Sequence, residues 1–173
     1  MVFIDVDGVL NPHDDLGAAH LTQLGYHTHR YTGPGPHGAT VDGHIWLNPQ
    51  HGTWLAELAA LGAELAWATS WGPQAANWIA PRLGLPDDMP NVDIGPYGAT
   101  VRFGWSTKLD PIRQWAANRP FAWFDDVLGP RDLEWAKQRT ADEHPTLLVE
   151  VAPHVGLTRA HIDTVRRWLE RLG

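Results

Sequence analysis

The sequence predicts a three-layer α/β fold, in which a parallel sheet carries helices on both faces. Short, continuous apolar runs alternate along the chain with longer stretches whose apolar residues recur at helical spacing, and several of these runs end in polar residues. Alternating strands and helices form right-handed crossovers, so the strands lie parallel. Ligands of such folds bind beyond the carboxyl ends of the strands.

Strands and helices are predicted in strict alternation. The core strands are expected over residues 2–6, 64–69, 121–124 and 146–151. Helices are expected over residues 49–61, 73–80, 109–116 and 130–139, and after Thr158 as the N-terminal cap. The helix residues expected to face the core include Trp54, Leu55, Leu58, Leu61, Leu109, Ile112, Trp115, Ala116, Ile162, Val165, Trp168, Leu169 and Leu172. The remaining irregular part, residues 81–107, contains short β-like pieces, of which 99–103 is the clearest.

One domain is expected to include all residues 1–173, because domains usually have roughly 100–200 residues. Residues 11–48 are rich in glycine, proline and histidine and form an insertion within it. Alternating stretches at 26–32 and 40–47 flank a glycine and proline breaker at 33–36, which predicts a small β-hairpin flap.

Composition excludes several classes of function. The net charge is −7 and the chain has only two lysines, so it lacks the basic surface with which proteins bind long duplex nucleic acid. No apolar stretch reaches the roughly 18 residues of a membrane span, and the N-terminus does not resemble a signal peptide. The absence of cysteine is compatible with a reducing compartment. A cytoplasmic protein without a membrane partner is therefore expected.

Polar residues gather at the predicted ends of three strands. Asp5 and Asp7 follow the first strand, Thr69 ends the second, and Asp125 and Asp126 follow the third. Carboxylates that converge at one sheet edge repel one another, and a hard divalent cation relieves this repulsion. Magnesium binds oxygen ligands and tolerates one or two carboxylates together with water and a substrate phosphate. The pattern therefore predicts a Mg²⁺ site for phosphate chemistry.

Each polar residue has a chemically distinct task in such a site. Asp5 is positioned to attack phosphorus as a nucleophile. Asp7 lies past the strand end, where Gly8 permits a sharp turn, and it can protonate the leaving oxygen and later deprotonate water. Thr69 offers a hydroxyl to a phosphoryl oxygen, while Lys108 supplies a cation for the transferring group. These four residues are the catalytic candidates.

The same residues carry a resemblance to the haloacid dehalogenase superfamily. Residues 5–10, Asp-Val-Asp-Gly-Val-Leu, resemble its first motif, 68–70 (Ala-Thr-Ser) its second, Lys108 its third, and 124–126 (Phe-Asp-Asp) its fourth. The resemblance covers essentially the whole chain and implies a Rossmann-like core. It also implies that Asp5, the backbone carbonyl of Asp7 and Asp125 bind magnesium, with Asp126 in support.

The resemblance implies an activity as well. Aspartate at position 7 is typical of the phosphatase branch, so a magnesium-dependent phosphomonoester hydrolase with an aspartyl-phosphate intermediate is expected. Residues 67–71, with a tryptophan on each side of the second motif, resemble small members associated with RNA-repair proteins. The insertion is too small for a helical cap, so a minimal cap would leave the site open to a phosphorylated small molecule, a phosphoprotein, or a nucleotide or oligonucleotide end. The rival functions are a phosphotransferase that uses the same intermediate and a non-catalytic module that binds phosphate or phosphoprotein.

Several residue assignments stay open at this point. Ser70 can act in place of Thr69, and Asp132 can replace Asp126 as the supporting acid, although an acid at the start of a helix is also favoured by the helix dipole.

Aromatic and histidine side chains leave a further choice. Trp71 and Trp105 lie near the predicted site and can stack on a base or wall the pocket. His27 and His29 share one face of a predicted strand, where a metal or substrate role competes with simple solvent exposure.

Overall fold

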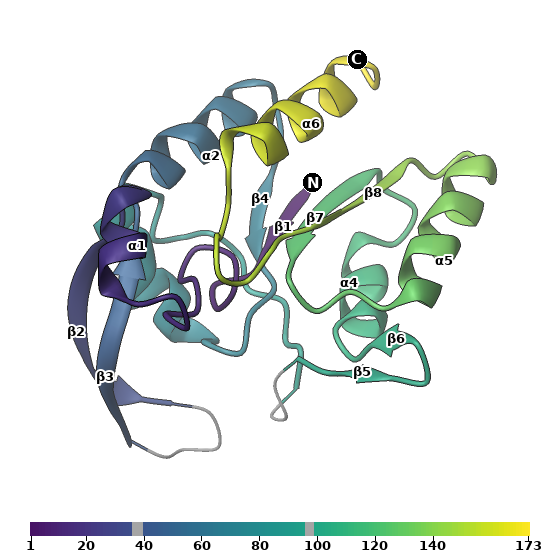
Figure 1. Ribbon diagram of the computed structural model, residues 1–173. Helices are drawn as coiled ribbons and strands as arrows, with labels where there is room; N and C mark the ends of the chain where they lie inside the picture. Colours follow the sequence, from purple (N-terminus) through teal and green to yellow (C-terminus); the bar gives the residue numbers. More distant parts are fainter. Residues whose placement is uncertain (36–39, 96–98) are drawn as a thin grey trace.

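A four-stranded parallel sheet forms the centre of the molecule (Figure 1). The computed structural model describes residues 1–35, 40–95 and 99–173. The strands are β1 (Val2–Ile4), β4 (Leu65–Trp67), β7 (Phe121–Asp125) and β8 (Thr146–Glu150), in the order β4-β1-β7-β8. The predicted α/β class is thereby confirmed.

The central strands are buried on both faces. Every residue of β1, β4 and β7 is buried, which explains why the sequence reads there as continuous apolar runs and not as alternating ones. Val2 of β1 pairs with Leu65 on one side and with Ala122 on the other. Because the pairing is parallel and nearly in step, the three strands end at the same edge of the sheet.

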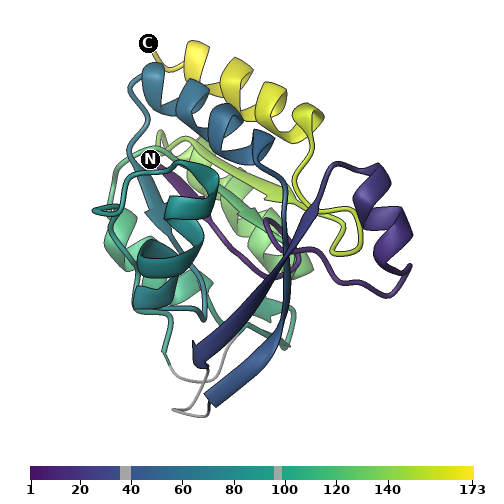
Figure 2. The same cartoon turned by 90° about the vertical axis from the view of Figure 1, so that its left-hand side faces the viewer.

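Helices cover both faces of the sheet. Helices α2 (Gln50–Ala60) and α6 (Arg159–Glu170) lie side by side on one face, as Figures 1 and 2 both show. Helices α4 (Leu109–Ala116) and α5 (Pro130–Ala141) lie on the other face. Within the described part of the chain, no helix has both the length and the apolar character that crossing a membrane requires.

The sheet separates two apolar cores. Ile4 packs in one cluster with Leu55 of α2 and Ile162 of α6. Its neighbour Phe3 packs in the other cluster with Ile112 of α4 and Trp123 of β7. Successive strand residues point to opposite faces, so one strand supplies both cores.

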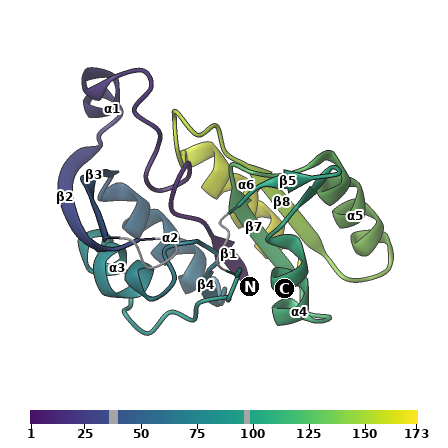
Figure 3. The ribbon, with the colours of Figure 1, turned by 90° about the horizontal axis from the view of Figure 1, so that it is seen from below.

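Two antiparallel hairpins lie at the carboxyl edge of the sheet. Strands β2 (His27–Pro34) and β3 (Thr40–Leu47) form the predicted hairpin, and β5 (Val101–Arg102) pairs with β6 (Trp105–Ser106). Seen from below, the two hairpins flank the strand ends on opposite sides (Figure 3). The predicted position of the turn, residues 33–36, is partly wrong, because Gly33 and Pro34 still belong to β2. The last residue of that predicted turn, 36, lies outside the described residues.

Local helices differ from the prediction in two places. Helix α1 (Ala18–Gln23) was not predicted, because it is short and buries a single residue, Leu21, so it has little apolar periodicity. The helix expected over 73–80 instead contains a π-helical segment η2 (Ala75–Ile79) and continues as α3 (Ala80–Leu83). Pro81 is compatible with this continuation because it lies in the first turn of α3.

Three residues near helix ends that were predicted to face the core are exposed instead. Leu61, Trp115 and Leu172 are 47%, 39% and 40% exposed. Leu61 is the cap residue after α2, Leu172 follows the end of α6, and Trp115 is next to the last residue of α4. Helical spacing predicts which face is apolar but not how far along the helix the sheet covers it.

Candidate active site

Three neighbouring strands bring polar side chains to the same edge of the sheet. Asp5 directly follows β1, and its amide extends the ladder by donating to the Phe124 carbonyl at 3.2 Å. Asp125 is the last residue of β7, the neighbouring strand. On the other side of β1, Thr69 lies two residues past the end of β4 and is buried. The parallel sheet thus assembles residues from distant parts of the sequence.

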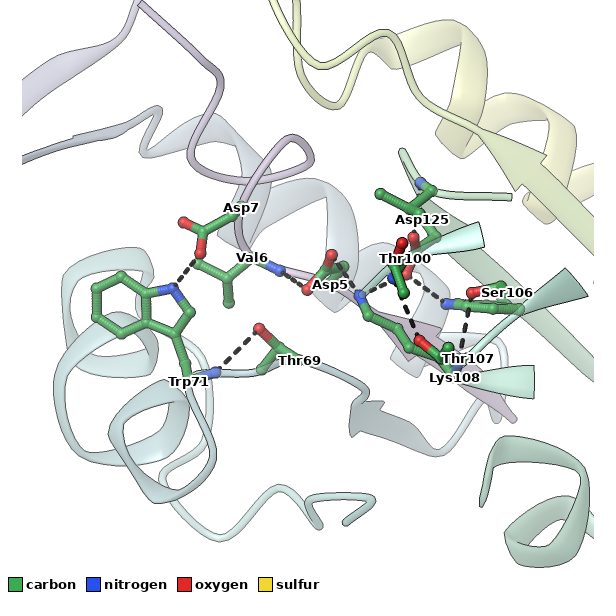
Figure 4. Close-up of polar contacts among 12 residues, drawn as sticks. Asp5, Val6, Asp7, Thr69, Trp71, Thr100, Ser106, Thr107, Lys108 and Asp125 are labelled. Atoms are coloured by element: carbon green, nitrogen blue, oxygen red, sulfur yellow. Dashed lines mark hydrogen bonds and ion pairs between the residues drawn. The ribbon is translucent and has the colours of Figure 1, made fainter. Parts of the chain in front are cut away.

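Lys108 connects the first and fourth motifs. It is the N-terminal cap residue of α4, and its side chain is 1% exposed. Its Nζ lies 2.5 Å from Asp5 Oδ2 and 2.7 Å from Asp125 Oδ2 (Figure 4). Burial alone would lower the pKa of Lys108, but the two carboxylates outweigh it and raise that pKa. The lysine therefore stays charged.

Further donors fix the Asp125 carboxylate. Trp123 Nε1 donates to Asp125 Oδ2 at 3.1 Å, and the Val127 amide donates to Oδ1 at 2.8 Å. Burial, together with the charge of Asp5, raises the pKa of Asp125, and Lys108 opposes this rise. A completely buried acid is thus held in one orientation by bonds to both of its oxygens.

Asp126 packs directly against the turn after β1. Gly8 has φ +76°, and a Cβ at this position would lie 2.3 Å from Asp126 Cγ, so only glycine permits this approach. Within the described ranges, Asp5, Asp125 and Asp126 form the one group of three side chains spaced to hold a metal, with their ligand oxygens within 4.8 Å of one another. The Asp7 carboxylate is not in this group, and the role predicted for its backbone carbonyl stays a prediction.

Asp7 is held by two donors beside this group. Asn11 Nδ2 donates to its Oδ1 at 2.8 Å, and Trp71 Nε1 donates to its Oδ2 at 2.9 Å (Figure 4). Burial raises the pKa of Asp7, and the two donors oppose that rise. Asn11 also accepts the Trp46 amide of β3 through Oδ1 at 2.9 Å, so Asp7 is connected to the β2–β3 hairpin.

The second motif offers two hydroxyl groups in different surroundings. Thr69 is buried, and its Oγ1 accepts the Trp71 amide at a long 3.4 Å. Ser70 is partly exposed and lines a cavity next to Asp7. Thr69 is therefore the hydroxyl on the side of Asp5, as Figure 4 shows, while Ser70 faces the cavity.

Asp132 has a different environment from the acids of the metal-spaced group. Its Oδ2 accepts the amides of Ser106 at 2.9 Å and Gly129 at 2.6 Å, which closes the first turn of α5. Ser106 Oγ in turn accepts the Lys108 amide at 3.4 Å. The alternative that Asp132 replaces Asp126 is not supported, since Asp132 lies outside the group of three.

A cavity of about 250 Å³ opens beside Asp7. Its described lining comes from the β2–β3 hairpin and the second motif: Asp7, Tyr31, Pro34, Gly35, Val41, Ile45, Ser70 and Trp71. Trp71 therefore walls a pocket next to the predicted site. Trp105, which was also predicted to lie near the site, lines a separate hollow with Arg102 and Arg113 on the α4 side.

Comparison with known proteins decides the family. The family model for the HAD domain in Swiss Army Knife RNA repair proteins matches residues 1–162. The chain belongs to this family. All four motifs lie within the matched residues, and the resemblance to haloacid dehalogenase-like proteins is confirmed. No curated protein and no solved structure matches the chain.

Sequence reasoning missed three side chains that orient the site residues of this HAD domain. Asn11 binds Asp7, Trp123 binds Asp125, and Ser106 supports the Lys108 amide. Asn11 lies four residues after Asp7, within a tight turn, and this short spacing is a signal that could have identified it. The other two contacts depend on the tertiary structure. His27 and His29 belong to no group of three possible metal ligands in the part of the chain that the structure describes.

The acidic group of this HAD domain has the chemistry of a site for a hard cation. Its three carboxylates face one ammonium group, Lys108, so negative charge is in excess. Burial raises the pKa of both Asp125 and Asp126, which means that their charged forms lack full compensation from the protein. An all-oxygen set of donors suits Mg²⁺. The residues present therefore fit a bound magnesium ion.

Proposed function

We propose that this chain is a magnesium-dependent phosphomonoester hydrolase in which Asp5 is the nucleophile. The observation that carries the proposal is the convergence of Asp5, Asp125 and Asp126 with the buried ammonium of Lys108. The Val6 amide donates to Asp5 Oδ1 at 2.7 Å and Lys108 Nζ contacts Oδ2, so the carboxylate is oriented by both neighbours. A carboxylate fixed in this way is prepared for in-line attack.

In the first step, an Asp5 oxygen forms a bond to phosphorus while the bond from phosphorus to the leaving oxygen breaks. Asp7 gives its proton to that oxygen, and an alcohol leaves. In the second step, Asp7 takes a proton from water as the water attacks phosphorus, which releases phosphate and restores Asp5. The raised pKa of Asp7 supports this role, because burial favours the protonated form that the first step needs.

Lys108 and Thr69 stabilise charge around the transferring group. The Lys108 ammonium already contacts Asp5, so it is close to the oxygens that gain charge during attack. Thr69 is buried at the neighbouring strand end and can donate its hydroxyl to a phosphoryl oxygen. Both side chains bind and orient the phosphoryl group, and neither exchanges a proton with it.

Asp5, Asp125 and Asp126, with the backbone carbonyl of Asp7, would hold the magnesium ion. The bound ion would screen the charge between the attacking carboxylate and the phosphate and polarise a phosphoryl oxygen. Removal of Mg²⁺ with EDTA is expected to abolish hydrolysis, and added Mg²⁺ should restore it. Ca²⁺ is larger and takes six to eight ligands, so it should restore much less activity. Unchanged activity in EDTA would contradict the metal site.

The expected substrate is a nucleotide or the end of an oligonucleotide. The matching family is described by RNA repair, and the net charge of −7 disfavours binding along a long duplex. A chain end offers one phosphomonoester and requires few contacts to the rest of the nucleic acid. We place this activity in the cytoplasm, for which the lack of cysteine is the supporting observation.

The decisive experiment replaces the nucleophile. Asp5→Asn keeps the size of the side chain but removes its charge, so hydrolysis of p-nitrophenyl phosphate in Mg²⁺ should fall by about a thousandfold or more. The matched control is Asp142→Asn, an exposed position at the end of α5, which should keep full activity. Thermal melting checks that both variants fold. Full activity in folded Asp5→Asn would reject the mechanism and leave a different nucleophile or a binding module.

A further inference from the structure

The cavity beside Asp7 lies on one particular side of the reacting groups. Figure 4 shows Asp7 and Trp71 on one side of Asp5, and Lys108 and Asp125 on the other. Under the proposed function Asp7 protonates the leaving oxygen, so the leaving group must lie on the Asp7 side. The cavity of about 250 Å³ adjoins Asp7 at this point. It is therefore placed to receive the leaving group and not the phosphate.

A rigid aromatic wall forms part of this cavity. The rings of Tyr31 and Trp71 have centroids 4.9 Å apart and are tilted by 57°, and Trp78 stacks against Trp71 with centroids 6.0 Å apart. The Tyr31 hydroxyl donates to the Pro34 carbonyl at 2.6 Å, which fixes the ring to its own hairpin. Because the rings support one another, the wall presents a fixed surface to a ligand. Flat rings bind well to such surfaces.

The remaining lining limits the ligand further. Val41 and Ile45 of β3 add aliphatic surface. Among the described lining residues, Asp7 is the one charged side chain, so nothing in this lining compensates a second phosphate or a carboxylate on the leaving group. About 250 Å³ is slightly below the roughly 300–1,000 Å³ of small-molecule pockets, so it admits one ring system with its attached groups. The part of the leaving group that enters the cavity is then flat, uncharged and small.

We propose that this cavity binds the nucleoside that leaves from a nucleotide phosphate, with its base against the wall of Tyr31 and Trp71. A nucleoside is uncharged, and its base supplies the flat ring. The inference rests on the proposed function for the position of the phosphate, and the description of the family by RNA repair agrees with it. Stacking tolerates every base, so all four nucleosides should bind with similar strength.

Trp71 connects base binding with acid catalysis. Its ring walls the cavity, while its Nε1 donates to Asp7 Oδ2 at 2.9 Å. It is thus a specificity-determining residue that also positions the proposed acid. Trp71→Phe keeps an aromatic ring but loses the donor, so kcat should fall about tenfold on substrates with and without a base, while KM for the nucleotide changes less. An unchanged kcat would remove the positioning role.

Ligand binding to an inactive variant tests whether the cavity binds the base, independently of hydrolysis. AMP and ribose 5-phosphate differ only by the base, and calorimetry with each ligand in Mg²⁺ uses the Asp5→Asn protein. AMP should bind about tenfold more tightly than ribose 5-phosphate. Equal affinities overturn the proposal, whether or not the wild-type protein hydrolyses phosphomonoesters. Conversely, base-dependent binding with no hydrolysis by the wild type would reject the proposed function alone.

A matched pair of variants locates the bound base. Val41 lies at the exposed rim of the cavity, so Val41→Trp should fill it and reduce the preference for AMP at least fivefold in the Asp5→Asn background. His44 is exposed on the same strand with opposite alternation, so His44→Trp should keep the preference. Equal effects of the two substitutions would place the base elsewhere.

Substrate comparison in the wild-type protein identifies the source of the nucleoside. The kcat/KM values of AMP, of a short 5′-phosphorylated oligoribonucleotide and of a phosphotyrosine peptide are compared. The kcat/KM of AMP or of the oligoribonucleotide should exceed that of ribose 5-phosphate by about tenfold. Whichever of these two has the higher kcat/KM shows whether the substrate is a free nucleotide or a chain end. A phosphotyrosine peptide that is hydrolysed better than both would assign the cavity to a phenol ring and overturn the nucleoside proposal.

Discussion

Lys108 and His51 are both buried bases, yet their surroundings differ in kind. Lys108, at the carboxyl edge of the sheet, lies between the carboxylates of Asp5 and Asp125. His51, in the first turn of α2, is 0% exposed and packs edge-on against Tyr26, with ring centroids 5.4 Å apart. In the described part of the chain, neither of its ring nitrogens has a hydrogen-bond partner.

The difference teaches that burial alone does not mark a functional site. Burial lowers the pKa of both bases, but the two carboxylates reverse the effect at Lys108 and raise its pKa. At His51 burial dominates, and the pKa falls to about 4. One base therefore keeps its charge near neutral pH and the other is neutral. The partners decide which buried base can take part in charge chemistry.

The largest effect is expected from removing the charge of Lys108. Lys108→Met keeps an unbranched side chain but leaves Asp5 and Asp125 without their cation, so kcat/KM should fall about 100–1,000-fold. The other lysine of the chain, Lys137, is an exposed partner of Glu134, and Lys137→Met is the matched control with unchanged activity. Steady-state assays on p-nitrophenyl phosphate measure both. Less than a threefold loss at position 108 would mean that this buried charge is structural.

His51 should act on stability and not on catalysis. Its pKa is about 4 in the folded protein against 6.5 in an unfolded chain, so between these values only the unfolded state takes up the proton. The free energy of unfolding should therefore fall by about 3 kcal/mol as the pH drops from 6.5 to 4, with no further loss from this group below pH 4. Urea unfolding at several pH values measures this slope.

The variant His51→Leu isolates that contribution. Leucine cannot bind the proton, so the variant should lose about 3 kcal/mol less than the wild type between pH 6.5 and 4. Gln50→Leu, at the exposed neighbouring position, removes no titratable group and is the control that should keep the wild-type pH dependence. Parallel curves for His51→Leu and the wild type would show that the histidine has a charge-stabilising partner after all.

Asp132 extends the comparison of buried charged groups, and its removal is expected to have a smaller effect. Among the described residues, the partners of this buried acid are backbone amides and not a cation, since its Oδ2 accepts from Ser106 and Gly129. Asp132→Ala leaves both amides without an acceptor and should lower the free energy of unfolding by about 2 kcal/mol. The exposed Asp142→Ala is the control. Equal stability of the two variants in urea would remove the structural role of Asp132.

Local patterns in the sequence determined much of the fold. The apolar runs at β1, β4, β7 and β8 predicted a parallel sheet, because strands covered on both faces need apolar residues at every position. The hairpin of β2 and β3 was predicted from its alternation on both sides of a turn. Helix α1 and the covered lengths of the helices were not, since both depend on which surfaces pack together.

In the candidate site, too, some features were predictable from the sequence and others were not. Residue order and spacing alone identified Asp5, Asp7, Thr69, Lys108, Asp125 and Asp126 as candidates, because acids that follow adjacent parallel strands must meet at one edge. Only the tertiary structure decided that Trp71 holds Asp7 and that Tyr31 reaches Trp71 to form a wall. The physical reason is distance along the chain: Tyr31 and Trp71 are brought together by the packing of the hairpin, and no local pattern encodes that contact.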